Sequence, residues 1–220
     1  MSDWTLNGLP VLRASLHAPL QGRWTADVEV DTDDALTGPV DLVVGGVLWR
    51  AAVLRGGLGL GTWRARLVGG TGGLDLPVAA RAWQGLQAAR GLVVELLTEV
   101  GETLDAGSGD ELTTTLPRWS RVDTLAHRAL ADLAGAVDAR WRVTPEGAVW
   151  VGTETWPEII LPDGVQVETL DDDPRRGVSV CSVPGGWITP GRSLDGRRIG
   201  AVAYELTPER DRLTVWWVDG

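Results

Sequence analysis

Apolar and polar residues alternate along the first part of the chain, a pattern typical of β-strands with one buried face. The segments Arg23–Asp31 and Gly61–Val68 each place apolar side chains on one face and charged or polar side chains on the other. Two apolar runs, Val40–Val44 and Val47–Leu54, are separated by Gly45-Gly46, a pair that supplies the positive φ angles of a hairpin turn. The sequence therefore predicts an antiparallel β unit, a small sandwich or barrel, at this end.

Further along the chain, the spacing of apolar residues changes from every second residue, as in a strand, to the 3.6-residue period of a helix. One apolar stripe follows i, i+3, i+4, i+7, i+8, i+11 spacing and consists of Ala89, Leu92, Val93, Leu96, Leu97 and Val100. Gly101 stands where a C-terminal cap belongs. A second helix is predicted to open with Ser120 and Asp123 in capping-box spacing and to end near Gly135. Its apolar side would be formed by Val122, Leu125, Ala129, Leu130 and Leu133.

The remaining segments return to strand patterns with turn signals between them. Arg140–Thr144 and Ala148–Gly152 flank Pro145-Glu146-Gly147 and predict a strand, a turn and a second strand. Four further strands are expected at Val165–Thr169, Val178–Ser182, Ile199–Leu206 and Arg212–Val218. The charged run Asp171–Arg176 is interpreted as a turn, either balanced internally or in contact with a neighbouring subunit.

Together these patterns predict a mainly β fold with two α-helices, an α+β chain built from small antiparallel β-barrel or sandwich units. We expect three parts. Residues 1–78 would form an N-terminal antiparallel β unit, residues 79–160 a helix-containing α+β segment, and residues 161–220 a C-terminal small β-barrel or sheet.

Composition narrows the range of functions. The 220 residues include 20 basic and 30 acidic side chains, and the formal charge of −10 argues against a protein that coats nucleic acid. Every basic residue is arginine, and 12 tryptophans with no phenylalanine must supply the aromatic bulk of the core. The single cysteine, Cys181, excludes a disulfide within the chain and a multi-cysteine zinc site. No stretch is long and apolar enough to predict membrane insertion, and the first residues lack the pattern of a signal peptide, so we expect synthesis in the cytoplasm.

Two glycine- or aspartate-rich segments resemble ligand loops only superficially. A Walker loop needs a lysine, which the chain lacks, and Gly57–Gly61 has the wrong spacing for a dinucleotide fingerprint and continues as a strand. Asp31–Asp34 begins like a calcium loop, but Ala35 and Leu36 occupy a ligand and the sharp-turn position. We therefore expect a strand connection and a solvated turn, with no cofactor and no metal.

Candidate catalytic residues are few. Only His17 and His127 are available as histidine proton carriers, and Cys181 lies among valines in a predicted strand, where cysteine is usually a buried hydrophobe. Gly107-Ser108-Gly109 lacks the spacing of a nucleophile elbow. Glu95 and Glu99 lie one helical turn apart and would suit a two-carboxylate hydrolase, but they are predicted on the solvated face opposite the apolar stripe.

Tryptophan is distributed over nearly every predicted strand, in greater number than one core of this size needs. The adjacent pair Trp216-Trp217 must point to opposite faces of its sheet, so one ring would be exposed in a monomer. Exposed aromatic and arginine side chains are typical of subunit interfaces. The predicted interface residues are Trp187, Trp216, Trp217, Arg175 and Arg176.

Several segments between residues 80 and 220 resemble hub proteins of bacteriophage tail baseplates, the late-control-protein-D-like family of tailed phages and related contractile injection systems. The segments that carry the resemblance are Val94–Glu102, Leu116–Trp119, Ala129–Leu133, Trp141–Gly152, Pro190-Gly191, Ile199–Tyr204 and Arg212–Trp216. Many such hubs are much longer, so this chain would be a compact version without a fused spike or lysozyme.

The resemblance implies a structural, non-enzymatic subunit of the virion tail tip. Copies would form a ring, a homotrimer in the family pattern, that joins the tail tube to the central spike and lets DNA pass. The implied partners are further copies of the chain, the tube, the spike and other baseplate proteins, with DNA present only in transit. An acidic channel that repels phosphate would be consistent with the charge of −10.

Two alternatives from other classes remain at this stage. The first is a tail-associated cell-wall hydrolase with Glu95 or Glu99 in its site. The second is a carbohydrate-binding module in which exposed tryptophans would stack on sugar rings.

Overall fold

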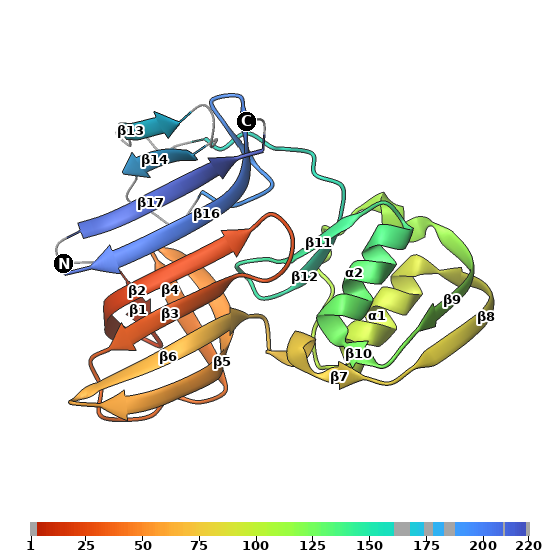
Figure 1. Cartoon of the computed structure of the whole chain (residues 1–220), viewed down its shortest axis with the longest axis horizontal. Coiled ribbons are helices and arrows are strands. Elements are labelled where there is room, and N and C mark those ends of the chain that lie inside the picture. Colours follow the sequence, from red (N-terminus) through yellow and green to blue (C-terminus); the bar gives the residue numbers. More distant parts are fainter. Residues whose placement is uncertain (1–3, 161–167, 174–177, 183–187, 209, 219–220) are drawn as a thin grey trace.

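The computed structural model describes residues 4–160, 168–173, 178–182, 188–208 and 210–218, with side chains described outside 161–187 and Arg210. Strands account for most of the regular structure, and the two α-helices are α1 (Ala89–Glu99) and α2 (Ala126–Ala136). The β-rich body and the helical unit lie side by side, with the helices at one end of the long axis (Figure 1). The fold is therefore mainly β with two helices, as the sequence predicts.

Six N-terminal strands form a closed antiparallel barrel. They are β1 (Thr5–Leu6), β2 (Leu9–Pro19), β3 (Thr25–Val30), β4 (Pro39–Val44), β5 (Val47–Gly59) and β6 (Thr62–Gly69). Their order is β1-β4-β5-β6-β3-β2, and the additional pairing of β1 with β2 closes the barrel. The alternation seen in the sequence is the alternation between the barrel interior and its outer face, since Ala26, Val28 and Val30 are buried while Asp27 is exposed.

The predicted glycine hairpin is confirmed. Gly45 and Gly46 have φ of 52° and 84°, and Val44 pairs with Val47 directly before and after them. The strand that follows is longer than the pattern suggested, because β5 runs on through Gly56 and Gly57 to pair with the whole of β6. This second hairpin turns at Leu60-Gly61.

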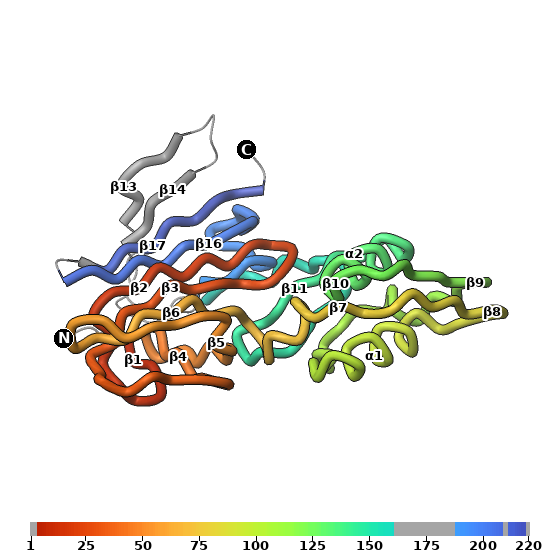
Figure 2. Tube along the Cα trace, turned by 60° about the horizontal axis from the view of Figure 1, so that its bottom comes forward, coloured from red at the N-terminus to blue at the C-terminus, as the bar shows by residue number. Residues whose placement is uncertain are grey.

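The C-terminal strands extend the barrel sheet. They are β13 (Glu168–Asp173), β14 (Val178–Ser182), β15 (Ser193–Leu194), β16 (Arg197–Thr207) and β17 (Arg210–Trp217). β16 pairs with the second half of β2, where Tyr204 lies opposite Leu16, and the order continues β2-β16-β17-β14-β13. Figure 2 shows β16 and β17 running beside β2 and β3 of the barrel. The division into 1–78, 79–160 and 161–220 stays a prediction.

The helical unit is wrapped by a two-stranded ribbon. The ribbon consists of β7 (Pro77–Val78) and β8 (Arg81–Ala88) paired with β10 (Thr124–Leu125) and β9 (Thr115–Arg121). The unit ends in the strand pair β11 (Arg140–Val143) and β12 (Val149–Gly152), as predicted. Two short 3₁₀ segments, Gly73–Asp75 and Asp110–Thr113, complete it. Within the described ranges, no helix is both long and apolar enough to cross a membrane.

One hydrophobic core extends from the barrel into the helical unit, and tryptophans form part of it. Trp24 and Trp49 meet edge to face with ring centroids 5.2 Å apart, and Tyr204 lies 6.4 Å from Trp49. Among the residues whose side chains the structure describes, five tryptophans are buried: Trp4, Trp24, Trp49, Trp63 and Trp141. The expectation that tryptophan supplies the aromatic bulk of the core is confirmed.

The first helix is confirmed in full, whereas the predicted start of the second is wrong. α2 begins at Ala126, and Ser120 lies in β9, where it pairs with Ala82 of β8. Asp123 accepts a hydrogen bond from the backbone N–H of Ala80 instead of capping a helix. The capping-box spacing was misleading because a strand about 40 residues away in the sequence competes for this backbone, and local spacing carries no information about it.

Two further differences from the prediction concern strands. The charged segment at Asp171–Asp173 is the end of β13, with Asp172 opposite Ser179, instead of part of a turn. The strands β2, β8 and β9 had no counterpart in the prediction. β8 and β9 are exposed on most of their residues, so neither shows the clean alternation that identifies a half-buried strand.

Candidate interaction site

The outer face of the barrel presents charged side chains in rows that run across the strands. In one row, Arg64 of β6, Glu29 of β3 and Arg13 of β2 lie opposite one another. The Arg64 guanidinium donates to Glu29 at 2.9 Å, and this hydrogen bond holds the pKa of that carboxyl below its ordinary value. Cross-strand register therefore gathers residues that are far apart in the sequence.

The neighbouring row consists of Arg55, Arg66, Asp27 and Ser15, from β5, β6, β3 and β2. Arg66 pairs with Asp27 and also donates to the Thr25 hydroxyl at 3.0 Å. Arg55 makes no ion pair with the described residues. Arginine thus predominates on this part of the surface, although the chain as a whole is acidic.

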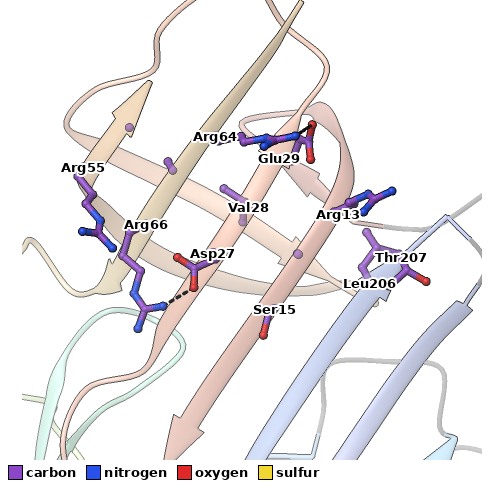
Figure 3. A pocket seen from close by; sticks show the side chains of 13 residues that line it. Arg13, Ser15, Asp27, Val28, Glu29, Arg55, Arg64, Arg66, Leu206 and Thr207 are labelled. Atoms are coloured by element: carbon purple, nitrogen blue, oxygen red, sulfur yellow. Dashed lines mark hydrogen bonds and ion pairs between the residues drawn. The ribbon is translucent and has the colours of Figure 1, made fainter. Parts of the chain in front are cut away.

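Between the two rows lies an open hollow of about 670 Å³. Figure 3 shows Arg55 and Arg66 on one side of it and Arg64, Glu29 and Arg13 on the other, with Leu206 and Thr207 of β16 at its end. Its floor is formed by Gly56 and by the backbone of Ala14, Val28 and Ala65, whose side chains are buried in the barrel core. The hollow can accept small apolar groups on its floor and acidic groups at its rim.

The most exposed apolar side chains of the barrel lie at the turn between β5 and β6. Leu60 is fully exposed and has a φ of 50°, and Leu58 is 55% exposed. The acidic loop after β3 lies beside them, since a Cβ at Gly61 would be 3.9 Å from Asp33 Oδ1. We call Leu58, Leu60, Asp31, Asp33 and Asp34 the hairpin tip.

A second cavity, of about 570 Å³, lies where the barrel, β11–β12 and the segment before β15 meet. Its polar centre is the ion pair of Arg142 with Glu154, whose side chain is 4% exposed. Arg142 also stacks on Trp150 at 4.1 Å, and Gly191 is held so close that a Cβ there would lie 2.5 Å from Glu154 Oε2. Burial raises the pKa of Glu154, and the positive charge of Arg142 opposes that shift.

Glu95 and Glu99 are not the freely solvated carboxylates that the helix pattern predicts. Glu95 pairs with Arg81 and accepts the Trp83 indole N–H at 3.2 Å, while Glu99 accepts from Arg121 at 2.6 Å. The Arg121 side chain is 5% exposed. These contacts fasten the β8–β9 ribbon to α1, so both carboxylates have a structural role in the fold.

The other chemical candidates have ordinary structural environments. Ser108 is buried, and its hydroxyl accepts the backbone N–H of Val151 at 3.1 Å. His127 Nδ1 lies 3.0 Å from the carbonyl oxygen of Leu74. His17 meets Trp216 edge to face. Cys181 lies in β14. Among the described residues, no group of three His, Cys, Asp or Glu side chains could hold a metal ion.

The predicted interface residues fall into two groups. Trp187, Arg175 and Arg176 lie outside the described residues. Trp216 and Trp217 are half-buried: Trp216 lies with its ring centroid 6.0 Å from that of His17, while Trp217 packs against the core and carries the Arg197 guanidinium at 4.4 Å. Their role at an interface stays a prediction.

The exposed apolar surface consists of leucine, isoleucine and valine instead of tryptophan. In the described part of the chain, no tryptophan is among the exposed large hydrophobic residues. The arginine rows were also missed as a site. The alternation had placed Arg64 and Arg66 on one face and Asp27 and Glu29 on another strand, but only the pairing of β3 with β6 brings them together.

The fold, a six-stranded barrel with a helical unit, is similar to that of phage tail proteins of known structure. The chain superimposes on the 43 kDa tail protein of prophage MuSo2 from Shewanella oneidensis with a TM-score of 0.66, 10% identity and coverage of 98% of this chain and 97% of that chain. A tail protein from Neisseria meningitidis MC58 gives 0.60, 12% identity and coverage of 97% and 95%.

A third similar structure comes from a secretion system. The E. coli c3393 protein, a component of the type VI secretion system with structural similarity to the T4 tail proteins gp27 and gp5, gives a TM-score of 0.56 at 11% identity, with 97% of this chain and 75% of that chain covered. No known family and no curated protein matches the sequence itself. The resemblance to tail and baseplate proteins is thus confirmed at the level of the fold.

Proposed function

We propose that this protein is a structural subunit of a phage tail baseplate hub. In this proposal, copies form a ring, a homotrimer, at the tail tip of the virion, where it joins the tail tube to the central spike and DNA passes through it. The observation that carries the proposal is the match over 98% of this chain and 97% of the Shewanella tail protein, since a likeness of that extent leaves little of either chain unaccounted for.

A non-enzymatic role is part of the proposal. Glu95 and Glu99, the residues that a cell-wall hydrolase would use, are paired with Arg81 and Arg121 of the ribbon. A carbohydrate-binding module would need exposed tryptophan faces, and the described tryptophans are buried or half-buried. Neither alternative therefore has a supporting site in the described residues.

The test is to locate the protein in assembled particles. Electron cryomicroscopy of tails, with the chain carrying a small C-terminal label, should place it on the tail axis between tube and spike. Tails made without it should lack the spike and fail to eject DNA. A position off the axis, or normal tails in its absence, would contradict the hub proposal.

An enzymatic assay complements the imaging. Purified protein should leave peptidoglycan intact in a zymogram. Lysis that is lost in Glu95→Gln or Glu99→Gln, with folding retained, would reinstate the hydrolase alternative.

A further inference from the structure

The hairpin tip has the properties of a surface that another protein covers. Leu60 combines full exposure with a left-handed backbone, a conformation that is unfavourable for a residue other than glycine. Glycine or asparagine would suit this turn better. A leucine with neither a favourable backbone nor buried surface in the chain is explained by contact with a partner.

The charge around the tip limits what that partner can be. Asp31, Asp33 and Asp34 form no ion pair in the described chain, and the two leucines lie beside them. A complementary surface must offer a shallow apolar floor with arginine or lysine at its rim. Such a surface exists on the same chain: the hollow has four arginines against two carboxylates, and its floor is formed by Gly56 and by the backbone of Ala14, Val28 and Ala65.

The tip cannot reach the hollow of its own chain. Leu60 lies four residues before Arg64 on the hairpin, about 13 Å along the strand at the usual rise per residue. Both strands of the hairpin are held by continuous pairing from Gly59 opposite Thr62 back to Ala51 opposite Gly69. The hairpin therefore cannot fold back, and a contact between tip and hollow requires two chains.

We propose that the hairpin tip of one copy docks into the arginine-rimmed hollow of a second copy. Leu58 and Leu60 lie over Ala14, Gly56 and Ala65, and the carboxylates of Asp33 and Asp34 meet Arg13 and Arg55. Since the two surfaces differ, the contact can repeat head-to-tail from copy to copy, and contacts of this type generate rings when the rotation closes. The inference rests on the proposed function in one respect, because it names the surface through which ring subunits join.

Charge reversal on each side tests whether these two surfaces meet. The tip variant is Asp33→Arg with Asp34→Arg, and the hollow variant is Arg13→Glu with Arg55→Glu. Each places like charges against the partner surface, so the dissociation constant of the assembly should rise at least about tenfold. Arg118→Glu with Arg128→Glu, two exposed arginines of the helical unit, is the matched control and should leave the native mass unchanged.

Variants that restore opposite charges across the contact between tip and hollow make the test specific. A chain with all four reversals carries a basic tip and an acidic hollow, and it should assemble again. A mixture of the tip variant with the hollow variant should form mixed complexes that contain both chains and that neither variant forms alone, because a basic tip can then meet an acidic hollow. Native mass spectrometry and light scattering of the full chain report both results.

Leu60→Asn provides a readout that a purely local role would not give. Asparagine suits the left-handed turn and should leave the fold as stable or more stable, yet assembly should weaken because the apolar contact is lost. The proposal is overturned if wild-type chain stays monomeric at high concentration, if reversals at tip and hollow leave the mass unchanged, or if the four-reversal chain fails to assemble while folded. An effect of the hollow variant alone would also overturn it, and would indicate that the hollow binds another anionic partner.

These outcomes are distinguishable from failure of the hub proposal. A chain that assembles through another surface, or only inside the tail, would still be found on the tail axis by electron cryomicroscopy. A chain that assembles through tip and hollow but lies elsewhere in the particle would support the contact and remove the hub role.

Discussion

The carboxylate of Glu102, shortly after the end of the first helix, accepts the backbone N–H of Gly73 at 2.9 Å. Both of its oxygens also lie 3.1 Å from the backbone nitrogen of Thr71, and the residue is only 4% exposed. The glycine-rich loop that leaves the barrel is thereby fixed to the helical unit by a buried carboxylate. The backbone N–H groups of this loop, which could otherwise bind an external anion, therefore bind a carboxylate of the same chain.

We predict that Glu102→Ala lowers the free energy of unfolding by about 1–3 kcal/mol, because the buried N–H of Gly73 and the partly buried N–H of Thr71 lose their acceptor. Glu102→Gln should fall between that variant and wild type, since one acceptor oxygen remains. Urea denaturation measures the difference. Glu146→Ala, at an exposed position, is the control and should change stability by less than about 0.5 kcal/mol.

Adjacent glycines in β5 offer a matched pair. A Cβ at Gly56 would lie 2.9 Å from the buried Trp63 ring, whereas a Cβ at Gly57 meets nothing within 4 Å. Gly56→Ala should therefore destabilise the barrel by about 1–3 kcal/mol through overpacking. Gly57→Ala should be neutral or slightly stabilising, since alanine restricts the unfolded chain. Equal midpoints of thermal unfolding for the two variants would show that Trp63 does not pack on Gly56.

The ribbon should depend on Arg121. Its guanidinium donates to Glu99 at 2.6 Å and to the carbonyl oxygen of Ala79 at 2.8 Å, and it lies 5.6 Å from the Trp83 ring. Arg121→Ala is expected to cost about 2 kcal/mol, less than a fully buried pair because Glu99 is partly exposed. Limited proteolysis should then cut within β8 or β9. Arg118→Ala, an exposed position on the same ribbon, should leave the digestion pattern unchanged.

Glu154 gives a pH dependence with a defined sign. Its pKa is raised above 4.5, chiefly by burial, so the folded state holds this proton more tightly than the unfolded state. Its stabilising contribution is therefore complete below 4.5 and is lost as pH rises through the folded pKa. Glu154→Gln should remove this loss of stability at rising pH, because glutamine does not ionise.

The measurement is the unfolding free energy of wild type and Glu154→Gln between about pH 4 and 7, with the difference between them plotted against pH. The unfolding free energy of Glu154→Gln should increase relative to that of wild type as pH rises. Acids with lowered pKa, such as Glu29 and Glu158, act in the opposite direction in both proteins and cancel in the difference. A difference that is flat across this range would contradict the raised pKa.

The local sequence pattern was sufficient to predict an element whose structure depends only on neighbouring residues. The stripe from Ala89 to Val100 predicted α1, and Gly45-Gly46 predicted the β4–β5 hairpin, because a 3.6-residue period and a positive-φ turn are properties of neighbouring residues. The same reasoning failed for β9. Its Ser120 and the nearby Asp123 have the spacing of a helix cap, but the backbone of β9 pairs with β8 instead.

The sequence by itself determined the mainly β character with two helices, the tryptophan-rich core and the scarcity of catalytic groups, since these follow from residue type and short-range period. Only the tertiary structure decided that the barrel closes through β1 and β2, that Glu95 and Glu99 fasten a ribbon, and that Arg13, Arg55, Arg64 and Arg66 surround one hollow. The physical reason is register: strands far apart in the sequence choose their partners by the summed burial and pairing of many residues, and that choice sets which side chains meet.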